Sequence, residues 1–159
     1  MNRSLDPALL KAASGVFEEL AFLLPSRELA DHQQTALFHM AAVVGFHGPI
    51  SGRLVIQMYG NVVPILAANM LGEGDPATDL QQRDALKELT NVVCGNLLPD
   101  LAGAETVYRI AAPCILDAPD LAGAIPGEPA AQLTIGMEEG RAVLQLFMCS
   151  EAKDSEPGP

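Results

Sequence analysis

Residues 84–98 read DALKELTNVVCGNLL and have the spacing of an amphipathic helix. Two of them are poor helix formers, because an interior Gly95 costs about 1 kcal/mol relative to alanine and Asn91 costs about 0.5–0.7 kcal/mol. At about 100° per residue, four residues unsuited to a core share one narrow stripe, the polar stripe: Asp84, Glu88, Asn91 and Gly95. The opposite side carries the apolar residues Leu86, Leu89, Val93 and Leu97. We therefore expect this helix to bury one face and expose the other.

The polar stripe has two interpretations. An exposed helix face with two acids and an amide is common, and short motifs have low specificity. Asp84 and Glu88 fit that interpretation, but Asn91 and Gly95 fit it less well, because exposed helix faces are usually filled with Lys, Glu or Gln. A glycine without a side chain would let a partner's surface approach the helix closely. The stripe could therefore be a binding surface.

Length and charge restrict the class of protein. The chain has 159 residues, 49% of them hydrophobic, and fits one domain over residues 1–150 with a polar, disordered tail over 151–159. A net charge of −11 argues against nucleic acid and anionic membranes as partners. No apolar run approaches the roughly 20 residues that a membrane helix needs. Three cysteines without CxxC spacing indicate a reducing, cytoplasmic setting.

Hydrophobic periodicity and Gly/Pro positions predict the secondary structure. We expect helices at 8–24 and 61–74, and a long helix at 78–98 that Pro99 ends. Strands are expected at 35–46, 53–60, 105–113, 131–137 and 141–149, the last two forming a hairpin. This order predicts an α+β fold of two layers, with a largely antiparallel sheet packed against two long helices and one short helix.

Other candidate sites are weaker. Cys94 has no histidine near it in sequence, and Cys114 and Cys149 are expected to be small buried residues in or beside strands. His32, His39 and His47 do not share metal-ligand spacing, so no metal site is predicted. The segment GEGDPATD at 72–79 has no following lysine and reads as a turn rather than a phosphate loop.

The pattern Asp84…Glu88…Asn91 resembles the active-site helix of the CheC/CheX/FliY family of chemotaxis phosphatases. Three further segments are similar to the family in the same order: GPISGRLVIQM (48–58), NVVPILAANMLG (61–72) and AAPCIL (111–116). The likeness runs from about residue 9 to residue 149 and is closest to CheX-like members. Motif and element order together are more specific than the motif alone.

The resemblance implies a phosphatase that hydrolyses the phospho-aspartate of a CheY-like response-regulator receiver domain. Asn91 would orient the attacking water, because an amide can donate to and accept from water without adding negative charge. Glu88 would pair with the receiver's active-site lysine, while Asp84 and Gly95 would be flanking contacts. The chain would bind no cofactor of its own, because the receiver would supply the Mg²⁺.

Alternatives remain at this stage. The same fold could serve as a non-catalytic module that binds a receiver or another signalling protein, or, less favoured, as a flagellar-switch component. When the spacing of Asp84, Glu88 and Asn91 is laid on the first helix, the corresponding residues are Ser14, Glu18 and Ala21. In another register, Glu19 and Phe22 take the places of Glu88 and Asn91. Neither register has the amide. We therefore expect one active site per chain. A homodimer is possible through an open sheet edge among the strands at 105–149.

Overall fold

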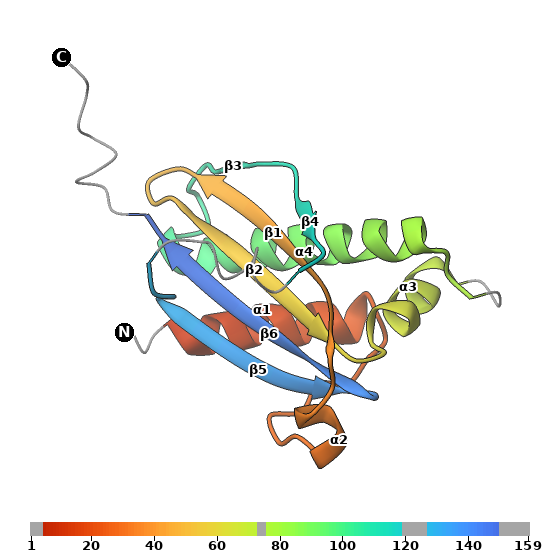
Figure 1. The fold of residues 1–159 in the computed structure, drawn as a ribbon. Helices are drawn as coiled ribbons and strands as arrows, with labels where there is room; N and C mark the ends of the chain where they lie inside the picture. Colours follow the sequence, from red (N-terminus) through yellow and green to blue (C-terminus); the bar gives the residue numbers. More distant parts are fainter. Residues whose placement is uncertain (1–4, 73–75, 119–126, 150–159) are drawn as a thin grey trace.

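The computed structural model describes residues 5–72, 76–118 and 127–149 (Figure 1). Four helices lie in these ranges: α1 (Leu5–Glu19), α2 (Asp31–Gln34), α3 (Val63–Leu71) and α4 (Asp79–Ala102). Six strands accompany them: β1 (Phe38–His47), β2 (Gly52–Tyr59), β3 (Arg109–Ile110), β4 (Cys114–Leu116), β5 (Ala131–Met137) and β6 (Gly140–Met148).

The strands form one sheet in the order β3-β1-β2-β6-β5, and β4 also pairs with β1. Every strand pairing in the described part of the chain is antiparallel. Helices α1 and α4 pack side by side on one face of this sheet (Figure 1). The predicted two-layer α+β fold, with two long helices and one short helix, is therefore confirmed. The single-turn helix α2 was not anticipated.

Alternation along the strands separates the two faces of the sheet. On β2, Leu54, Ile56 and Met58 are fully buried in the main core beneath the helices. Val55 points to the other face, where it forms a small second cluster with Phe147 of β6. A side-chain period of two residues explains why neighbours in sequence enter different clusters.

The predicted end of α3 is confirmed, and the predicted end of α1 is wrong. Pro64 lies in the first turn of α3, and Gly72 ends it in the left-handed conformation at φ 70°, as predicted. The first helix was predicted to reach residue 24 but ends at Glu19, because Phe22 turns the chain at φ 56°. Leu23 lies beyond the end of the helix but is still buried. Its backbone N–H donates to the carbonyl of Phe17 at 2.9 Å.

The prediction that Pro99 ends the long helix was wrong. Helix α4 contains Pro99 and continues to Ala102, where the N–H of Gly103 donates to the carbonyl of Pro99 at 2.8 Å. Proline removes a single donor from the ladder. Burial of Leu98 and packing of Leu101 against the core offset that loss.

The later strands were predicted unevenly. The hairpin of β5 and β6 lies where the sequence placed it, with its turn at Glu138 and Glu139. The predicted strand at 105–113 was wrong in extent, because only Arg109 and Ile110 pair there. The chain leaves the ladder at Ala112 and Pro113 and returns to β1 as β4. Proline cannot donate to a sheet ladder, which accounts for the interruption.

Strand β5 lies at one edge of the sheet, where Ser26 exchanges two backbone hydrogen bonds with Gly136 and covers part of it. Pairing of a second copy along the rest of that edge stays a prediction. The tail predicted at 151–159 lies outside the described residues. Within those described, each helix is too short or too polar to span a bilayer.

Candidate functional site

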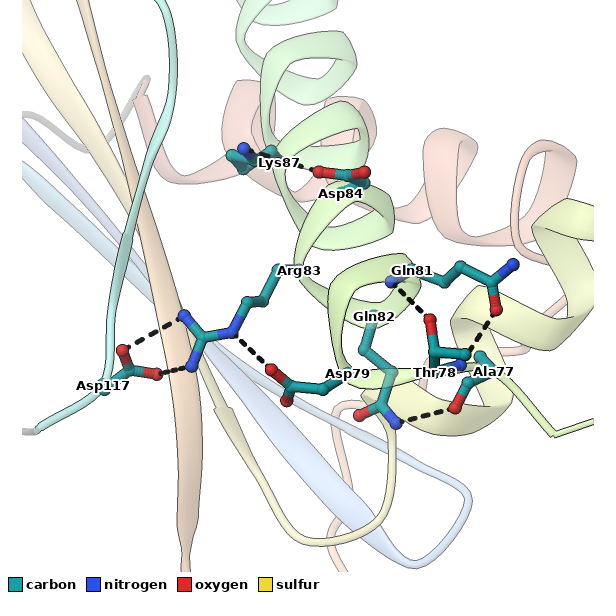
Figure 2. A network of polar contacts seen from close by, with 9 residues as sticks. All are labelled: Ala77, Thr78, Asp79, Gln81, Gln82, Arg83, Asp84, Lys87 and Asp117. Carbon is teal, nitrogen blue, oxygen red and sulfur yellow. Dashed lines mark hydrogen bonds and ion pairs between the residues drawn. The ribbon is translucent and has the colours of Figure 1, made fainter.

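The site is built on α4, whose first turn is fixed by a capping box (Figure 2). The backbone N–H of Gln81 donates to the Thr78 hydroxyl at 3.1 Å, and the Thr78 N–H donates to the Gln81 side chain at 2.9 Å. Each bond satisfies a donor that would otherwise be unpaired at the helix start. The beginning of α4, and hence the rotation of each later residue about its axis, is set at this point.

The buried face of α4 holds that rotation. Its apolar residues have no exposed surface: Leu86, Leu89, Val93 and Leu97. Thr90 is also fully buried, and its hydroxyl donates to the carbonyl of Leu86 at 2.7 Å, so no polar group is left unpaired by its burial. Burying each large aliphatic side chain stabilises the fold by about 1.5–3 kcal/mol. Rotation of α4 about its axis would expose these side chains and lose that stabilisation.

The polar stripe faces away from this core. Asp84, Glu88 and Gly95 are exposed, and Asn91 is half-exposed. A Cβ atom added at Gly95 would have no neighbour within 4 Å, so the backbone there is open to a partner's surface. The structure therefore places all four predicted site residues on the exposed side of one helix.

Three of these residues line a shallow groove, the α4 groove, of about 320 Å³. Its lining consists of Asp84, Lys87, Glu88, Asn91, Ala112 and Pro113. One wall is therefore helix α4, and the other is the chain just before β4. Gly95 does not line it. The arrangement brings two carboxylates and a carboxamide to one opening that a protruding group of another molecule could enter.

Two features adjust the charge and shape around the groove. The ammonium of Lys87 lies 3.5 Å from a carboxylate oxygen of Asp84, which offsets part of the negative charge at one end (Figure 2). Asp84 also lines a second hollow of about 250 Å³ between α3 and α4, with Met70, Leu71, Gln81 and Ala85. The polar stripe thus has a hollow on each side of its first turn.

Sequence reasoning missed part of the site. Ala112 and Pro113 form a wall that no helical wheel could place, although the proline does signal a break in the strand. Asp117 binds Arg83 of α4 through both carboxylate oxygens, at 2.7 and 3.1 Å, and no local signal in the sequence anticipates that pair. These contacts join segments about thirty residues apart, so they depend on the tertiary fold.

The structure also corrects the expectations for cysteine. Cys114 and Cys149 are exposed, not buried, because β4 turns Cys114 outward and Cys149 follows the end of β6. Cys94 is buried, and desolvation raises the pKa of its thiol to about 12. Such a thiol is a poor nucleophile.

The structure also describes the surroundings of the histidines and of the first helix. Within residues 5–72, 76–118 and 127–149, no group of three or more His, Cys, Asp or Glu side chains is arranged to hold a metal ion. On the α1 side, Glu18 is exposed, but Ala21 is buried just after the helix end. In this register the position that would need an amide faces the core, whereas in the other register that position is the exposed Phe22, which has no amide.

Comparison with known proteins identifies the family of this chain. The family model described as chemotaxis phosphatase CheX matches residues 40–135, which is more than half of the chain. The chain belongs to the CheX family. The match includes most of β1 and all of β2, α3 and α4, so it covers the entire polar stripe. No curated protein matches the chain significantly.

Solved CheX structures share the fold. CheX from Vibrio vulnificus has a TM-score of 0.71 at 18% identity, covering 94% of this chain and 100% of that one. CheX from Desulfovibrio desulfuricans has a TM-score of 0.72 at 15% identity, covering 91% and 99%. A CheX–CheY–BeF₃–Mg²⁺ complex from Borrelia burgdorferi has a TM-score of 0.66 at 17% identity, covering 91% and 97%. These TM-scores show that the chain shares the layered fold of the CheX structures.

Proposed function

We propose that this CheX-family chain hydrolyses the phospho-aspartate of a CheY-like receiver domain in the cytoplasm, using one site per chain. The observation that carries the proposal is that Glu88 and Asn91 line one exposed groove on a helix whose other face is fully buried. Family membership supports the phosphatase class, and the Borrelia protein's complex with CheY supports the class of partner.

Asn91 is assigned the orientation of the attacking water. In the reaction, water attacks phosphorus, the bond between phosphorus and the aspartyl oxygen breaks, and inorganic phosphate and a free carboxylate are released. The phosphoryl oxygens are negative, so a carboxylate beside them would repel them, whereas the neutral amide of Asn91 both donates to and accepts from water. An acyl phosphate is already reactive, and positioning can therefore supply most of the acceleration.

Glu88 is assigned the docking of the receiver. By the family resemblance, its carboxylate pairs with the lysine of the receiver's active site, which fixes the register in which α4 approaches. Glu88 precedes Asn91 by three residues, so the two side chains leave the same face of α4 about one turn apart. One side chain would hold the partner while the other reaches the phosphoryl group. Asp84 and Gly95 would be contacts at either end.

Neutralisation of the phosphoryl charge is assigned to a Mg²⁺ ion held by the receiver. The Borrelia complex contains Mg²⁺ and BeF₃ together with CheY, which agrees with this division of roles. Within this chain, the described residues of the α4 groove include two carboxylates and one amide but also the Lys87 ammonium, which is unfavourable for a bound cation. The chain would therefore act on a receiver that brings its own metal.

The test is the decay of a phosphorylated receiver with Mg²⁺ present, measured with wild type, Asn91→Ala and Asn96→Ala. Asn96 is exposed on the same helix but lies away from the polar stripe, so it controls for loss of an amide from α4. We expect Asn91→Ala to lose activity by about 10²-fold or more, and Asn96→Ala to keep it. Full activity of Asn91→Ala would reject the assignment. Binding without acceleration by the wild type would identify a non-catalytic receiver-binding module instead.

A further inference from the structure

Arg83 joins α4 to the opposite wall of the α4 groove. Its Nη1 and Nη2 atoms donate to the two carboxylate oxygens of Asp117 at 3.1 and 2.7 Å, and its Nε donates to Asp79 at 2.9 Å (Figure 2). All three nitrogens of the guanidinium are therefore engaged. Asp79 belongs to α4 itself, whereas Asp117 directly follows β4. The guanidinium thus connects two different parts of the fold.

The segment at residues 112–117, which ends at Asp117, is weakly held by the sheet. Ala112 and Pro113, the far wall of the groove, lie between β3 and β4. These strands contribute only two and three residues to the pairing with β1. Pro113 has no backbone N–H to give. Among the described residues, the ion pair of Arg83 with Asp117 is the only one that links this segment to α4.

The geometry of the pair favours precise placement over stability. Two parallel hydrogen bonds fix both the distance and the orientation of a carboxylate relative to a planar guanidinium. Both side chains keep contact with solvent, at 32% exposure for Arg83 and 59% for Asp117. Exposed ion pairs of this kind contribute little to the free energy of unfolding. Their effect on the position of a short, weakly held segment is therefore easier to detect than their effect on stability.

We propose that Arg83 is a positioning residue that, through Asp117, sets the width of the α4 groove and hence the fit of the receiver domain. This inference rests on the proposed function, because it takes the groove as the docking site. Arg83 itself does not line the groove, since the lining of α4 comes from Asp84, Lys87, Glu88 and Asn91. It would therefore act through the wall and not by touching the phosphoryl group.

The experiment compares Arg83→Gln and Asp117→Asn with the control Asp79→Asn, which removes the partner within α4 and leaves the link to Asp117. Amide hydrogen exchange over residues 112–117 reports how firmly the wall is held. Steady-state dephosphorylation of a receiver reports kcat and KM. We expect the first two variants to exchange faster and to raise KM, each by about three- to tenfold, with kcat unchanged. The control should match the wild type in both measurements.

Two further variants separate the explanations. Arg83→Lys keeps the charge but loses the planar fork, so wild-type behaviour of this variant would mean that charge alone matters and would overturn the inference. The double variant Arg83→Gln/Asp117→Asn should be no worse than either single one, because both break the same link. Additive losses, or an unchanged Asp117→Asn, would show instead that Arg83 contacts the receiver directly.

Failure of the proposed function would have a different signature. The wild-type chain would then accelerate no receiver's dephosphorylation, while the exchange rates would still distinguish Arg83→Gln from Asp79→Asn. That result would overturn the part of the inference that concerns the receiver. Equal exchange in all variants would overturn the link between Arg83 and the wall itself.

Discussion

Gly95 lies one helical turn before Pro99 within α4, so its carbonyl has no N–H to accept from four residues further along. Two explanations for this glycine follow. It could ease the local fit of the proline in the helix, or it could keep the exposed backbone clear for a partner. The space around it favours the second explanation, since a Cβ at this position would meet nothing within 4 Å.

Gly95→Ala separates these explanations. If the glycine serves the partner, alanine should raise the free energy of unfolding by about 1 kcal/mol, and the KM for the receiver should rise because the added methyl group lies in the docking surface. Chemical denaturation and dephosphorylation kinetics measure the two effects. A less stable variant with normal kinetics would assign Gly95 to the accommodation of Pro99.

Glu88→Gln tests docking by charge. The substitution keeps size and helix propensity but removes the negative charge, so the KM for the receiver should rise by about tenfold with a smaller effect on kcat. The wild-type KM should also increase with ionic strength, because salt screens an ion pair between molecules. A salt titration of both proteins measures this. An unchanged KM, or the same salt dependence in both, would contradict the role of Glu88.

Glu18→Gln tests the expectation of one site per chain. Glu18 is exposed on α1 as Glu88 is on α4, so the substitution makes the same chemical change on a comparable surface. We expect kcat and KM for the receiver to stay within about twofold of the wild type, because no amide accompanies Glu18. A loss of activity here, with Glu88 intact, would indicate that α1 also binds the receiver.

The cysteines give a prediction for thiol reactivity. At about pH 8, alkylation of the folded protein should modify Cys114 and Cys149 and leave Cys94, because the thiolate is the reactive form. Burial raises the pKa of Cys94 from 9.0 to about 12, so its thiolate is almost absent at that pH. Mass spectrometry should find two labels on the folded chain and three after unfolding. A third label without unfolding would contradict the burial of Cys94.

The same shift gives a pH dependence of stability. Above pH 9 the unfolded chain loses the Cys94 proton while the folded chain, in which the pKa of this thiol is about 12, retains it. The unfolded state is then favoured, so this group should lower stability progressively as pH rises from 9 towards about 12. Cys94→Ala should remove that contribution, which denaturation curves across the range would show.

The sequence predicts the parts of this fold that depend on periodicity. The helical spacing of Leu86, Leu89, Val93 and Leu97 places the buried face of α4, and with it the opposite stripe of Asp84, Glu88, Asn91 and Gly95. The alternation of the last two strands likewise predicts the β5–β6 hairpin. Each of these features depends on residues within a few positions of one another, so a single sequence contains the information.

The errors arise where contacts distant in sequence decide. Leu20 and Leu23 continue the apolar pattern of α1, yet Phe22 adopts a left-handed conformation with no glycine or proline to signal it. Pro99 reads as a helix end, but packing of Leu98 and Leu101 carries α4 past it. The pairing of Arg83 with Asp117 joins residues that only the finished fold brings together.

Packing constrains the two faces of α4 to different degrees, and this has an evolutionary consequence. The inward residues are constrained by close packing in the core, whereas the residues of the polar stripe lie at the surface and are not: Asp84, Glu88, Asn91 and Gly95. Under the proposed function, substitutions on the outward side would change which molecule is recognised without weakening the scaffold. Under that proposal, a handful of surface changes would be enough to direct a chain of this architecture to a different receiver.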